Sequence, residues 1–432
     1  MELFAALAYL DQHTNLEATA GRAEGLSLER MRTLTQVLGD PQTAYPVIHI
    51  TGTNGKGSTA RMVTELLRAN GLSVGTYTSP HLEHINERIA WDGVAIDDEH
   101  LAEAITAISE VEPLAGITPS YFEILTAAAF RYFADVAVDV AVIEVGMLGR
   151  FDATNVADAT VAVLTNVGHD HTDGVGAWRA AIAEEKVGIV KPGCTFVLGE
   201  TDPELRPIFE DTEAAALWVR GEQFDCVSST LAVGGRLVRL STPSGVIDDV
   251  LVPLHGGHQA DNASIALAAA EAFFGRPLDE DVVREAFATV RMPGRFEIVH
   301  RDPTVVLDAA HNVDGARACS ATLAEEFTLG GSLILVIGTL GGRDPREILE
   351  ALDIGDVGFL VACTPDSPRA IPGSEIAAIA DGMGVVAESV STVEDAVARA
   401  LALATADDFI LVTGSLYVVG AARTALLAEV DA

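Results

Sequence analysis

The sequence predicts an α/β protein of two domains, the first with a parallel sheet and a small antiparallel addition, the second of the same layered type. Apolar, strand-like runs alternate with helical stretches along most of the chain, which is typical of parallel sheets covered by helices. Residues 226–254 instead alternate apolar and polar positions around two glycine-containing turns, which indicates antiparallel hairpins appended to the first sheet. The helix-strand alternation restarts after residues 291–295, so we place the domains at 1–295 and 296–432.

The elements of the first domain follow from apolar periodicity. Residues 1–45 indicate helices and loops. Helical spacing of apolar residues predicts helices at 121–134 and 176–190. Short apolar runs predict buried strands at 47–50, 74–78, 138–145 and 160–165.

The second domain repeats this organisation with its own strands. A helix is predicted at 391–404, opened by a capping box between Ser391 and Glu394. Apolar runs predict strands at 305–308, 333–337, 357–361 and 409–412.

A glycine-rich loop at residues 51–58 lies between the first predicted strand and a helix that we expect to start near Ser58. The loop departs from the common phosphate-loop pattern, because Ile50 stands at the first glycine and Gly57 follows Lys56. Its context of strand, glycine loop and helix is nevertheless the one that a phosphate site requires. We therefore expect the glycines Gly52, Gly55 and Gly57 to let backbone N–H groups approach phosphate oxygens, with Lys56 adding a positive charge and Ser58 or Thr59 supplying a hydroxyl for Mg²⁺.

Three further polar side chains follow predicted strands. Ser79 comes after the strand at 74–78, Glu144 ends the strand at 138–145, and His171 lies six residues beyond Thr165. Ligands of open α/β sheets gather at the carboxyl ends of the strands. The sequence therefore predicts a Mg²⁺ site at this edge, although a histidine is an unusual ligand for that ion.

Lysine is rare in the chain, which makes its few positions informative. Acidic residues number 63 and basic residues 27, and only Lys56, Lys186 and Lys191 are lysines. A high-salt habitat and a high genomic GC content both favour such an arginine-using, acidic composition. Each lysine is therefore a candidate for chemistry that arginine cannot perform. The neutral Lys186 amine could react with CO₂ to give a carbamate, a carboxylate-like ligand for a second metal ion.

Bulk composition excludes several classes of partner. The formal net charge of −36 disfavours binding to nucleic acid or to an anionic membrane. The four cysteines lack metal-site or redox-motif spacing, which indicates reduced thiols. The N-terminal segment has no basic region of a signal peptide, and no apolar run is long enough to span a membrane. We therefore expect a cytoplasmic protein.

Ten motifs, taken together and in order, identify a resemblance that covers nearly the whole chain. The motifs are TGTNGKGS (51–58), SPHL (79–82), NERI (86–89), YFEILTAAAF (121–130), EVGMLGRFDATN (144–155), TNVGHDH (165–171), EEKVGIVKPG (184–193), HQADNAS (258–264), PGRFE (293–297) and DAAHNVDG (308–315). With them, the sequence resembles the family of folylpolyglutamate synthase and the bifunctional dihydrofolate synthase, in the Mur ligase superfamily. In this resemblance the shifted glycine loop is the Mur-ligase form of the phosphate loop.

The resemblance implies an N-terminal P-loop ATPase domain, a C-terminal Rossmann-like domain and a role for each matching residue. Lys56, Lys186 and His171 would be catalytic, and two Mg²⁺ ions would be held by Ser79, Glu144, His171 and carbamylated Lys186. Gly55, Lys56, Gly57 and Ser58 would hold ATP phosphates, and Asn262, Arg295, Asp308 and His311 would add to the ATP site. The pterin-bearing substrate would contact Leu28, Glu29, Arg30, Tyr121, Phe122, Glu123, Phe151, Asp152 and Ala153.

The implied function is an ATP-dependent amide ligase that adds L-glutamate to dihydropteroate, to folate or to both, through an acyl phosphate. We expect a monomer that takes small-molecule substrates. A Mur-type ligase of cell-wall or related precursors is an alternative, and a regulatory NTPase is a third reading. Three stretches depart from the family pattern, namely Leu148-Gly149, Glu83-His84-Ile85 and Gly341-Gly342-Arg343-Asp344.

Overall fold

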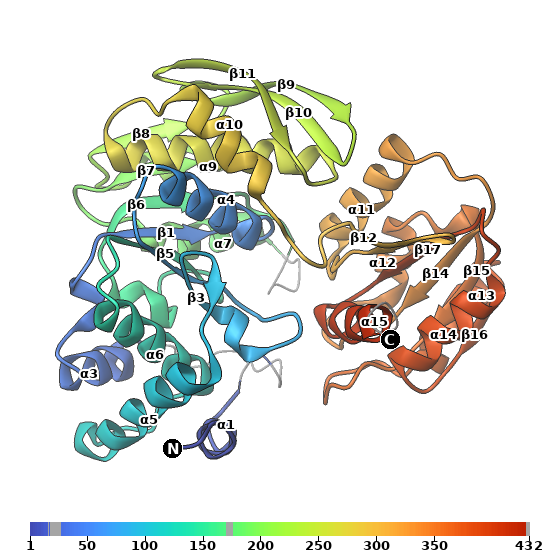
Figure 1. The fold of residues 1–432 in the computed structure, drawn as a ribbon, viewed down its shortest axis with the longest axis horizontal. Coiled ribbons are helices and arrows are strands. Elements are labelled where there is room, and N and C mark those ends of the chain that lie inside the picture. Colours follow the sequence, from blue (N-terminus) through green and yellow to red (C-terminus); the bar gives the residue numbers. More distant parts are fainter. Residues whose placement is uncertain (16, 18–26, 170–175, 429–432) are drawn as a thin grey trace.

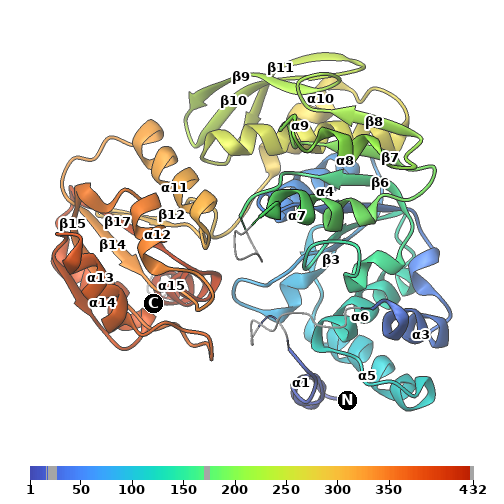
Figure 2. The same cartoon turned by 180° about the vertical axis from the view of Figure 1, so that it is seen from behind.

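A computed structural model describes residues 1–15, 17, 27–169 and 176–428. Its ribbon shows two α/β bodies side by side, the N-terminal one coloured from blue to yellow and the C-terminal one from orange to red (Figure 1). Seen from behind, the same two bodies remain separate, with α11 and β12 nearest the connection (Figure 2). The predicted two-domain α/β class is confirmed.

The first sheet has eight strands in the order β4-β3-β2-β5-β1-β6-β7-β8. Neighbouring strands from β2 to β8 run parallel, whereas β3 and β4 form an antiparallel edge that the sequence did not predict. The strands are β1 (Val47–Thr51), β2 (Val74–Tyr77), β3 (Ile89–Trp91), β4 (Val94–Ala95), β5 (Val140–Glu144), β6 (Ala159–Leu164), β7 (Thr195–Leu198) and β8 (Ala216–Val219).

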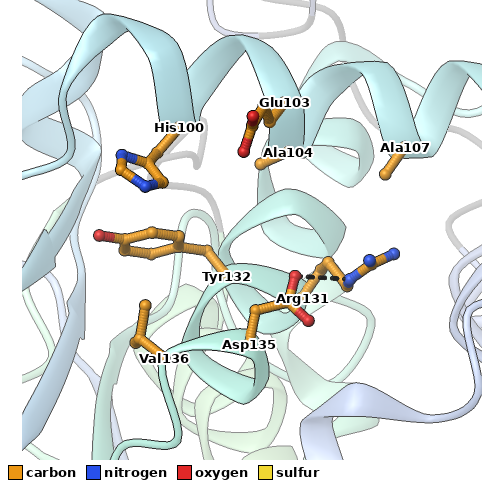
Figure 3. Close-up of a pocket in the computed structure, with 8 residues that line it drawn as sticks. All are labelled: His100, Glu103, Ala104, Ala107, Arg131, Tyr132, Asp135 and Val136. Atoms are coloured by element: carbon orange, nitrogen blue, oxygen red, sulfur yellow. Dashed lines mark hydrogen bonds and ion pairs between the residues drawn. The ribbon is translucent and has the colours of Figure 1, made fainter.

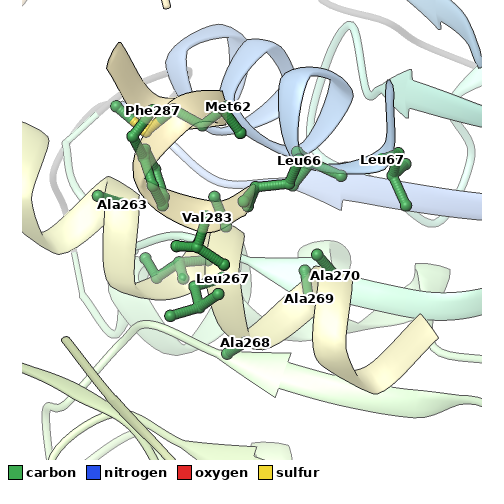
Figure 4. Packing of buried hydrophobic residues seen from close by; sticks show 14 of the residues in the cluster. Met62, Leu66, Leu67, Ala263, Leu267, Ala268, Ala269, Ala270, Val283 and Phe287 are labelled. Carbon is green, nitrogen blue, oxygen red and sulfur yellow. The ribbon is translucent and has the colours of Figure 1, made fainter. Parts of the chain in front are cut away.

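One face of this sheet is covered by α4 (Lys56–Ala69) and α9 (Gly257–Phe274), and α10 (Glu280–Thr289) packs on α4. Figure 4 shows Met62 and Leu66 of α4 beside Leu267 of α9 and Val283 of α10, all buried in one core cluster. This cluster also holds the side chains that β1, β5 and β6 point to that face. The helix that follows the glycine-rich loop is therefore anchored by apolar burial from Ala60 to Leu67.

On the opposite face, the described residues form six helices. Two core clusters join them to the strands, one around α5 and α6 and one around α7. The helices are α1 (Leu3–Leu10), α3 (Glu29–Val37), α5 (Asp98–Ala115), α6 (Tyr121–Asp135), α7 (Trp178–Lys186) and α8 (Arg206–Glu210), with 3₁₀ turns at Pro41–Thr43, Ile85–Arg88, Ala153–Val156 and Val187–Ile189.

The predicted antiparallel hairpins form a sheet of their own rather than an extension of the first sheet. Strands β9 (Asp225–Ala232), β10 (Gly235–Thr242) and β11 (Gly245–Val252) pair as a three-stranded sheet. Its buried residues Val238, Leu240 and Val250 share a core cluster with α9 and α10. The antiparallel hairpins are confirmed, whereas their attachment to the first sheet is not, because alternation reports one buried face and not the element that covers it.

The second domain is built on a six-stranded sheet in the order β12-β13-β17-β14-β15-β16, antiparallel only between β12 and β13. Core clusters lie on both of its faces. Its strands are β12 (Glu297–Arg301), β13 (Thr304–Leu307), β14 (Leu333–Ile337), β15 (Val357–Ala362), β16 (Ala387–Ser389) and β17 (Phe409–Thr413). Its helices are α11 (Val313–Glu326), α12 (Pro345–Ala351), α13 (Gly373–Gly382), α14 (Val393–Leu403) and α15 (Leu416–Ala428), with a 3₁₀ turn at Ile354–Asp356.

Three predicted helices need correction at their ends. Helix α4 begins at Lys56 rather than near Ser58, and the helix predicted at 176–190 is α7 (Trp178–Lys186) followed by a 3₁₀ turn. The capping box between Ser391 and Glu394 was also wrong. Thr392 is the N-cap of α14, and its side chain accepts a hydrogen bond from the Asp395 N–H. Adjacent Ser and Thr residues both suit an N-cap, so the sequence alone could not choose between them.

Within the described ranges, every helix is too short or too polar to cross a membrane.

Candidate active site

The phosphate loop wraps around the N-terminus of α4. Gly55 is the N-cap at φ 82°, a backbone region that residues with a side chain rarely adopt. A Cβ atom there would also lie 2.4 Å from the Asn262 Oδ1 atom, so the loop needs glycine at this position. The Lys56 Nζ atom donates to the carbonyls of Gly52 and Thr53 at 3.1 and 3.2 Å, which curls the side chain over its own loop.

Glu144 at the end of β5 brings a buried carboxylate to this loop. Its side chain is 5% exposed and accepts a hydrogen bond from the Ser79 N–H at 3.2 Å. A Cβ built on Gly57 would lie 3.4 Å from the Glu144 Oε2 atom. Burial raises the pKa of Glu144, against the opposing charges of Lys56 and Arg295. The predicted loop lysine, Ser79 and Glu144 therefore lie together at one sheet edge.

The loop after β6 joins the same edge through Asn54. The Asn54 N–H donates to Asn166 Oδ1, and its carbonyl accepts from Asn166 Nδ2, both at 3.0 Å. The Thr165 hydroxyl donates to the same carbonyl at 2.6 Å. His171, predicted to be a catalytic residue and a metal ligand, lies outside the described residues.

The second domain reaches this edge with the N-terminus of α11. The Asn312 Nδ2 group donates to Asn54 Oδ1 at 3.0 Å, while Asn312 Oδ1 caps α11 by accepting from the Gly315 N–H. Asp314 accepts from the His169 N–H at 3.2 Å. His311, placed in the ATP site by prediction, lies one residue before Asn312, with its Nδ1 atom 3.1 Å from the Ala309 carbonyl oxygen.

Asp308 and Arg295 meet at the connection between the domains. Asp308 accepts hydrogen bonds from the N–H groups of Phe296 and Ala310, each at 3.0 Å. Burial raises the pKa of Asp308, and the charges of Arg295 and His258 oppose that shift. Sequence reasoning assigned no role to His258. Its spacing of four residues from Asn262 on α9 was the available signal.

Lys186 is the last residue of α7 and is 4% exposed. The Arg150 N–H donates to the carbonyl of the preceding Glu185 at 2.8 Å, which joins α7 to the loop after β5. Asn155 Nδ2 donates to the carbonyls of Arg150 and Gly188 at 2.9 and 3.0 Å and closes the same junction. Lys186 therefore lies beside the chain segment that follows Glu144, as a buried rather than a solvated helix lysine.

Two of the predicted substrate segments lie against each other. Arg30 on α3 pairs with Glu123 on α6, with its Nε atom 3.2 Å from both carboxylate oxygens. Glu123 also completes a capping box with Ser120 at the start of α6. Phe122 lies under the loop after β5, because a Cβ on Gly146 would be 2.4 Å from its ring. The other predicted members of these segments are Leu28, Glu29 and Tyr121, of which Leu28 and Tyr121 are buried and Glu29 is exposed.

The third predicted substrate segment, Phe151–Ala153, offers one exposed ring. Phe151 is 40% exposed, whereas Asp152 and Ala153 are buried. Asp152 accepts hydrogen bonds from the N–H groups of Met147 and Thr154 at 2.8 and 3.0 Å, and burial raises the pKa of its carboxyl. Asp152 therefore holds the loop together, while Phe151 remains available for contact.

The residues at the sheet edge fit a Mg²⁺ ion in their chemistry. The Glu144 carboxylate and the Ser79 hydroxyl supply oxygen donors, which this ion prefers. Among the described residues, no group of three or more His, Cys, Asp or Glu side chains forms a metal cluster, so remaining ligands would come from phosphate oxygens, water or His171.

The surface pocket in Figure 3 lies between α5 and α6 around His100 and Tyr132 and contains none of the predicted site residues.

Comparison with known proteins places these features in one family. The model of the Mur ligase middle domain matches residues 50–270, and that of the Mur ligase glutamate ligase domain matches residues 294–416. A dihydrofolate synthase/folylpolyglutamate synthase of Mycobacterium tuberculosis is 42% identical, with 92% of this chain and 89% of that protein covered.

Solved structures agree with this comparison. Folylpolyglutamate synthase of Mycobacterium tuberculosis, complexed with ADP and AMPPCP, superposes with a TM-score of 0.90 at 39% identity, covering 98% of each chain. FolC of E. coli, in complex with DHPP and ADP, gives a TM-score of 0.87 at 30% identity over 99% of this chain and 98% of that one.

Proposed function

Because the chain belongs to the folylpolyglutamate synthase and dihydrofolate synthase family of Mur ligases, we propose that it joins L-glutamate to a folate or to dihydropteroate. The reaction consumes ATP and releases ADP. The observation that carries the proposal is the meeting of Lys56, Glu144 and Ser79 at one edge of the first sheet. The relatives and solved structures named above are folate enzymes, which favours this reaction over the Mur-type and regulatory NTPase alternatives.

The reaction must activate a carboxylate, because oxide is a poor leaving group. A substrate carboxylate oxygen attacks the γ-phosphorus, and the bond from that phosphorus to ADP breaks. Such transfer depends on positioning and charge neutralisation. The loop N–H groups and the Lys56 ammonium are placed to supply both. We therefore assign ATP phosphates to Gly55, Lys56, Gly57 and Ser58. Ser58 keeps slight exposure while Thr59 is fully buried, which favours the Ser58 hydroxyl.

The acyl phosphate then reacts with glutamate. The neutral amine attacks the carbonyl carbon, the bond from that carbon to the phosphate oxygen breaks, and phosphate leaves while the amine loses a proton. Water would destroy the acyl phosphate, so the site has to be closed during this step. The contacts that Asn312 and Asp314 make with the first domain support a closing role for the second domain. We assign Asn262, Arg295, Asp308 and His311 to the remainder of the ATP site.

Glu144 and Ser79 would hold the first Mg²⁺, with His171 as a further ligand. When bound, this ion neutralises charge on the phosphate oxygens. Leu28–Arg30, Tyr121–Glu123 and Phe151–Ala153 would contact the pterin-bearing substrate. The pairing of Arg30 with Glu123 and the exposed Phe151 ring support this assignment.

Lys186 would carry a carbamate that holds a second ion. Its side chain is buried beside the segment that follows Glu144, and an arginine could not form a carbamate. Lys186→Ala should lose most ligase activity and regain part of it with short-chain carboxylates. Wild-type protein incubated with ¹³C-bicarbonate should show a carbamate carbon signal by NMR that the variant lacks. Wild-type turnover by Lys186→Ala would contradict the assignment.

We further propose that the protein is a monomer in the cytoplasm. Its first domain would end at residue 295 and its second would begin at residue 296. Residues from both domains of one chain face the same edge, so one copy supplies the described parts of the site. The four cysteines are all free, in keeping with a reducing compartment.

ADP release by purified protein tests the function directly. We expect release that requires glutamate together with dihydropteroate or tetrahydrofolate, and comparing these two substrates decides which ligase activities are present. Equal ATP hydrolysis with and without both substrates would instead favour the regulatory NTPase. Release that requires a UDP-linked cell-wall precursor would favour the Mur-type alternative.

A further inference from the structure

The loop that begins at Ser79 is fixed at both of its ends. The Ser79 N–H donates to the Glu144 carboxylate at 3.2 Å. Further along the loop, the Glu87 carboxylate accepts from the N–H groups of Leu82, Glu83 and His84 at 2.8, 2.9 and 2.8 Å. A displacement at residues 82–84 would therefore be transmitted to Ser79 and the proposed metal-binding edge.

This loop lies directly on α15 of the second domain. A Cβ on Gly420 would be 2.1 Å from the Leu82 carbonyl oxygen, so the helix needs glycine where the loop backbone crosses it. The Leu82 side chain also approaches the link between the domains, because a Cβ on Gly294 would be 3.1 Å from it. The loop is thus seated in a close backbone contact between the two domains.

Glu83, one of the residues that depart from the family pattern, makes the polar part of this contact. Its carboxylate pairs with the guanidinium of Arg423 on α15, at 2.5 Å from the Nη1 atom. The Thr424 hydroxyl donates to the other carboxylate oxygen at 2.7 Å. One side chain of the first domain therefore receives two donors from the second.

An ion pair within the second domain fixes the orientation of the Arg423 side chain toward Glu83. Its Nε and Nη2 atoms bind the Glu297 carboxylate at 3.0 and 3.1 Å. Glu297 in turn accepts from the Gly294 N–H at 2.8 Å, next to Arg295. A planar guanidinium can serve two carboxylates at once in this way, which a lysine ammonium does less well.

Burial separates this cluster from ordinary surface ion pairs. The side chains of Glu83, Arg423 and Glu297 are 16%, 20% and 23% exposed. The pair of Arg399 with Glu388, wholly within the second domain, is 43% and 31% exposed. Partly buried pairs are screened less by solvent and salt, so the Glu83 contact should contribute more than a typical surface pair.

We propose that Glu83 is a positioning residue that locks the Ser79 loop onto the Arg423–Glu297 pair and so couples the proposed metal-binding edge to domain closure. The role in catalysis rests on the proposed function, whereas the locking itself does not. Opening of the domains would break the bond from Arg423 to Glu83 and leave the bond from Arg423 to Glu297 intact.

A double-mutant cycle tests the catalytic part. Glu83→Gln should lower kcat about tenfold, the effect of losing a partly buried, charge-assisted bond. Arg423→Met also removes the bonds to Glu297, so its kcat should fall at least as far. Each should also raise the Mg²⁺ concentration that gives half-maximal activity, which a merely structural role would not move. The double variant should fall little further than Arg423→Met alone. The matched control Arg399→Met should keep wild-type values. Wild-type kcat and Mg²⁺ dependence in Glu83→Gln, or effects that multiply independently, would overturn the proposal.

Amide hydrogen exchange tests the locking without any turnover. In the ligand-free protein, Glu83→Gln should exchange faster than wild type at residues 82–84 and on α15, and Arg399→Met should not. Unchanged exchange in Glu83→Gln would refute the lock even if the ligase activity is as proposed. Faster exchange in a protein without folate-dependent ADP release would instead refute the proposed function and leave the lock in place.

Discussion

The carboxyl ends of the two sheets contribute differently to the candidate site. At the first sheet, Lys56 and the buried Glu144 bring opposite charges to a glycine loop. At the second, Asp308 accepts from the backbone of its own domain, and Asn312 reaches across with a neutral amide. Under the proposed function, this difference assigns phosphoryl transfer to the first sheet and completion of the site to the second.

Removing the positive charge of Lys56 should have the largest effect and tests whether the first edge is the site of the chemistry. Lys56→Ala should lower kcat for ADP release by about 100-fold or more, because preorganised charge at a transferring phosphoryl group is among the largest catalytic contributions. Arg68→Ala, on the exposed side of the same helix, is the control and should retain activity. Comparable activity of both variants would place the phosphate site elsewhere.

A smaller loss should follow a change at the second edge. Asn312→Ala removes the hydrogen bond to Asn54 and the cap of α11, so kcat/KM should fall about fivefold to tenfold, in line with one or two hydrogen bonds. Steady-state ADP release measures it. Asn70→Ala, at the C-terminal end of α4, is the matched control. A loss as large as that of Lys56→Ala would mean that both edges take part equally in the chemistry.

A third prediction concerns stability beneath the first edge, where no effect on the chemistry is expected. His49 on β1 is fully buried, its Nε2 atom lies 2.8 Å from the Thr154 hydroxyl, and burial lowers its pKa from 6.5 to about 3. The unfolded chain binds a proton below pH 6.5 that folded His49 does not, so its contribution is lost as pH falls towards the folded pKa.

The stability difference between wild type and His49→Gln should therefore shrink on acidification, by about 1.4 kcal/mol per pH unit below pH 6.5. Denaturant unfolding at pH 7 and pH 5 measures it. His100→Gln, at an exposed histidine, serves as the control and should show no such narrowing. A difference that stays constant with pH would mean that His49 is protonated in the folded protein.

Local sequence patterns were sufficient to predict much of the fold and part of the candidate site. Strand periodicity and the glycine loop were sufficient to place β1, the loop and α4, because their determinants lie within about twenty residues of each other. The common edge for Lys56, Ser79 and Glu144 also follows from the rule that parallel strands end together. Their individual roles stay predictions, as do those of His171 and Lys186.

Features that depend on distant chain segments could not be predicted in this way. The sheet β9-β10-β11 packs its apolar face on α9 and α10. The alternation of apolar and polar residues along its strands predicts a buried face but not which helices cover it. Asn312 meets Asn54 across 258 positions of sequence, and Glu83 meets Arg423 across 340. Glu83 appeared in the sequence only as a departure from a family pattern, and its contact explains why a carboxylate suits that position.

The central claim is that nucleotide and metal meet at one edge of the first sheet, where a carboxyl group is activated. A crystal structure of the protein with ADP and Mg²⁺ tests it most directly. We predict phosphate density against the amides of Gly55–Ser58 and an ion within coordination distance of Glu144 and Ser79. Nucleotide density elsewhere, with this edge empty at saturating ligand, would contradict the account.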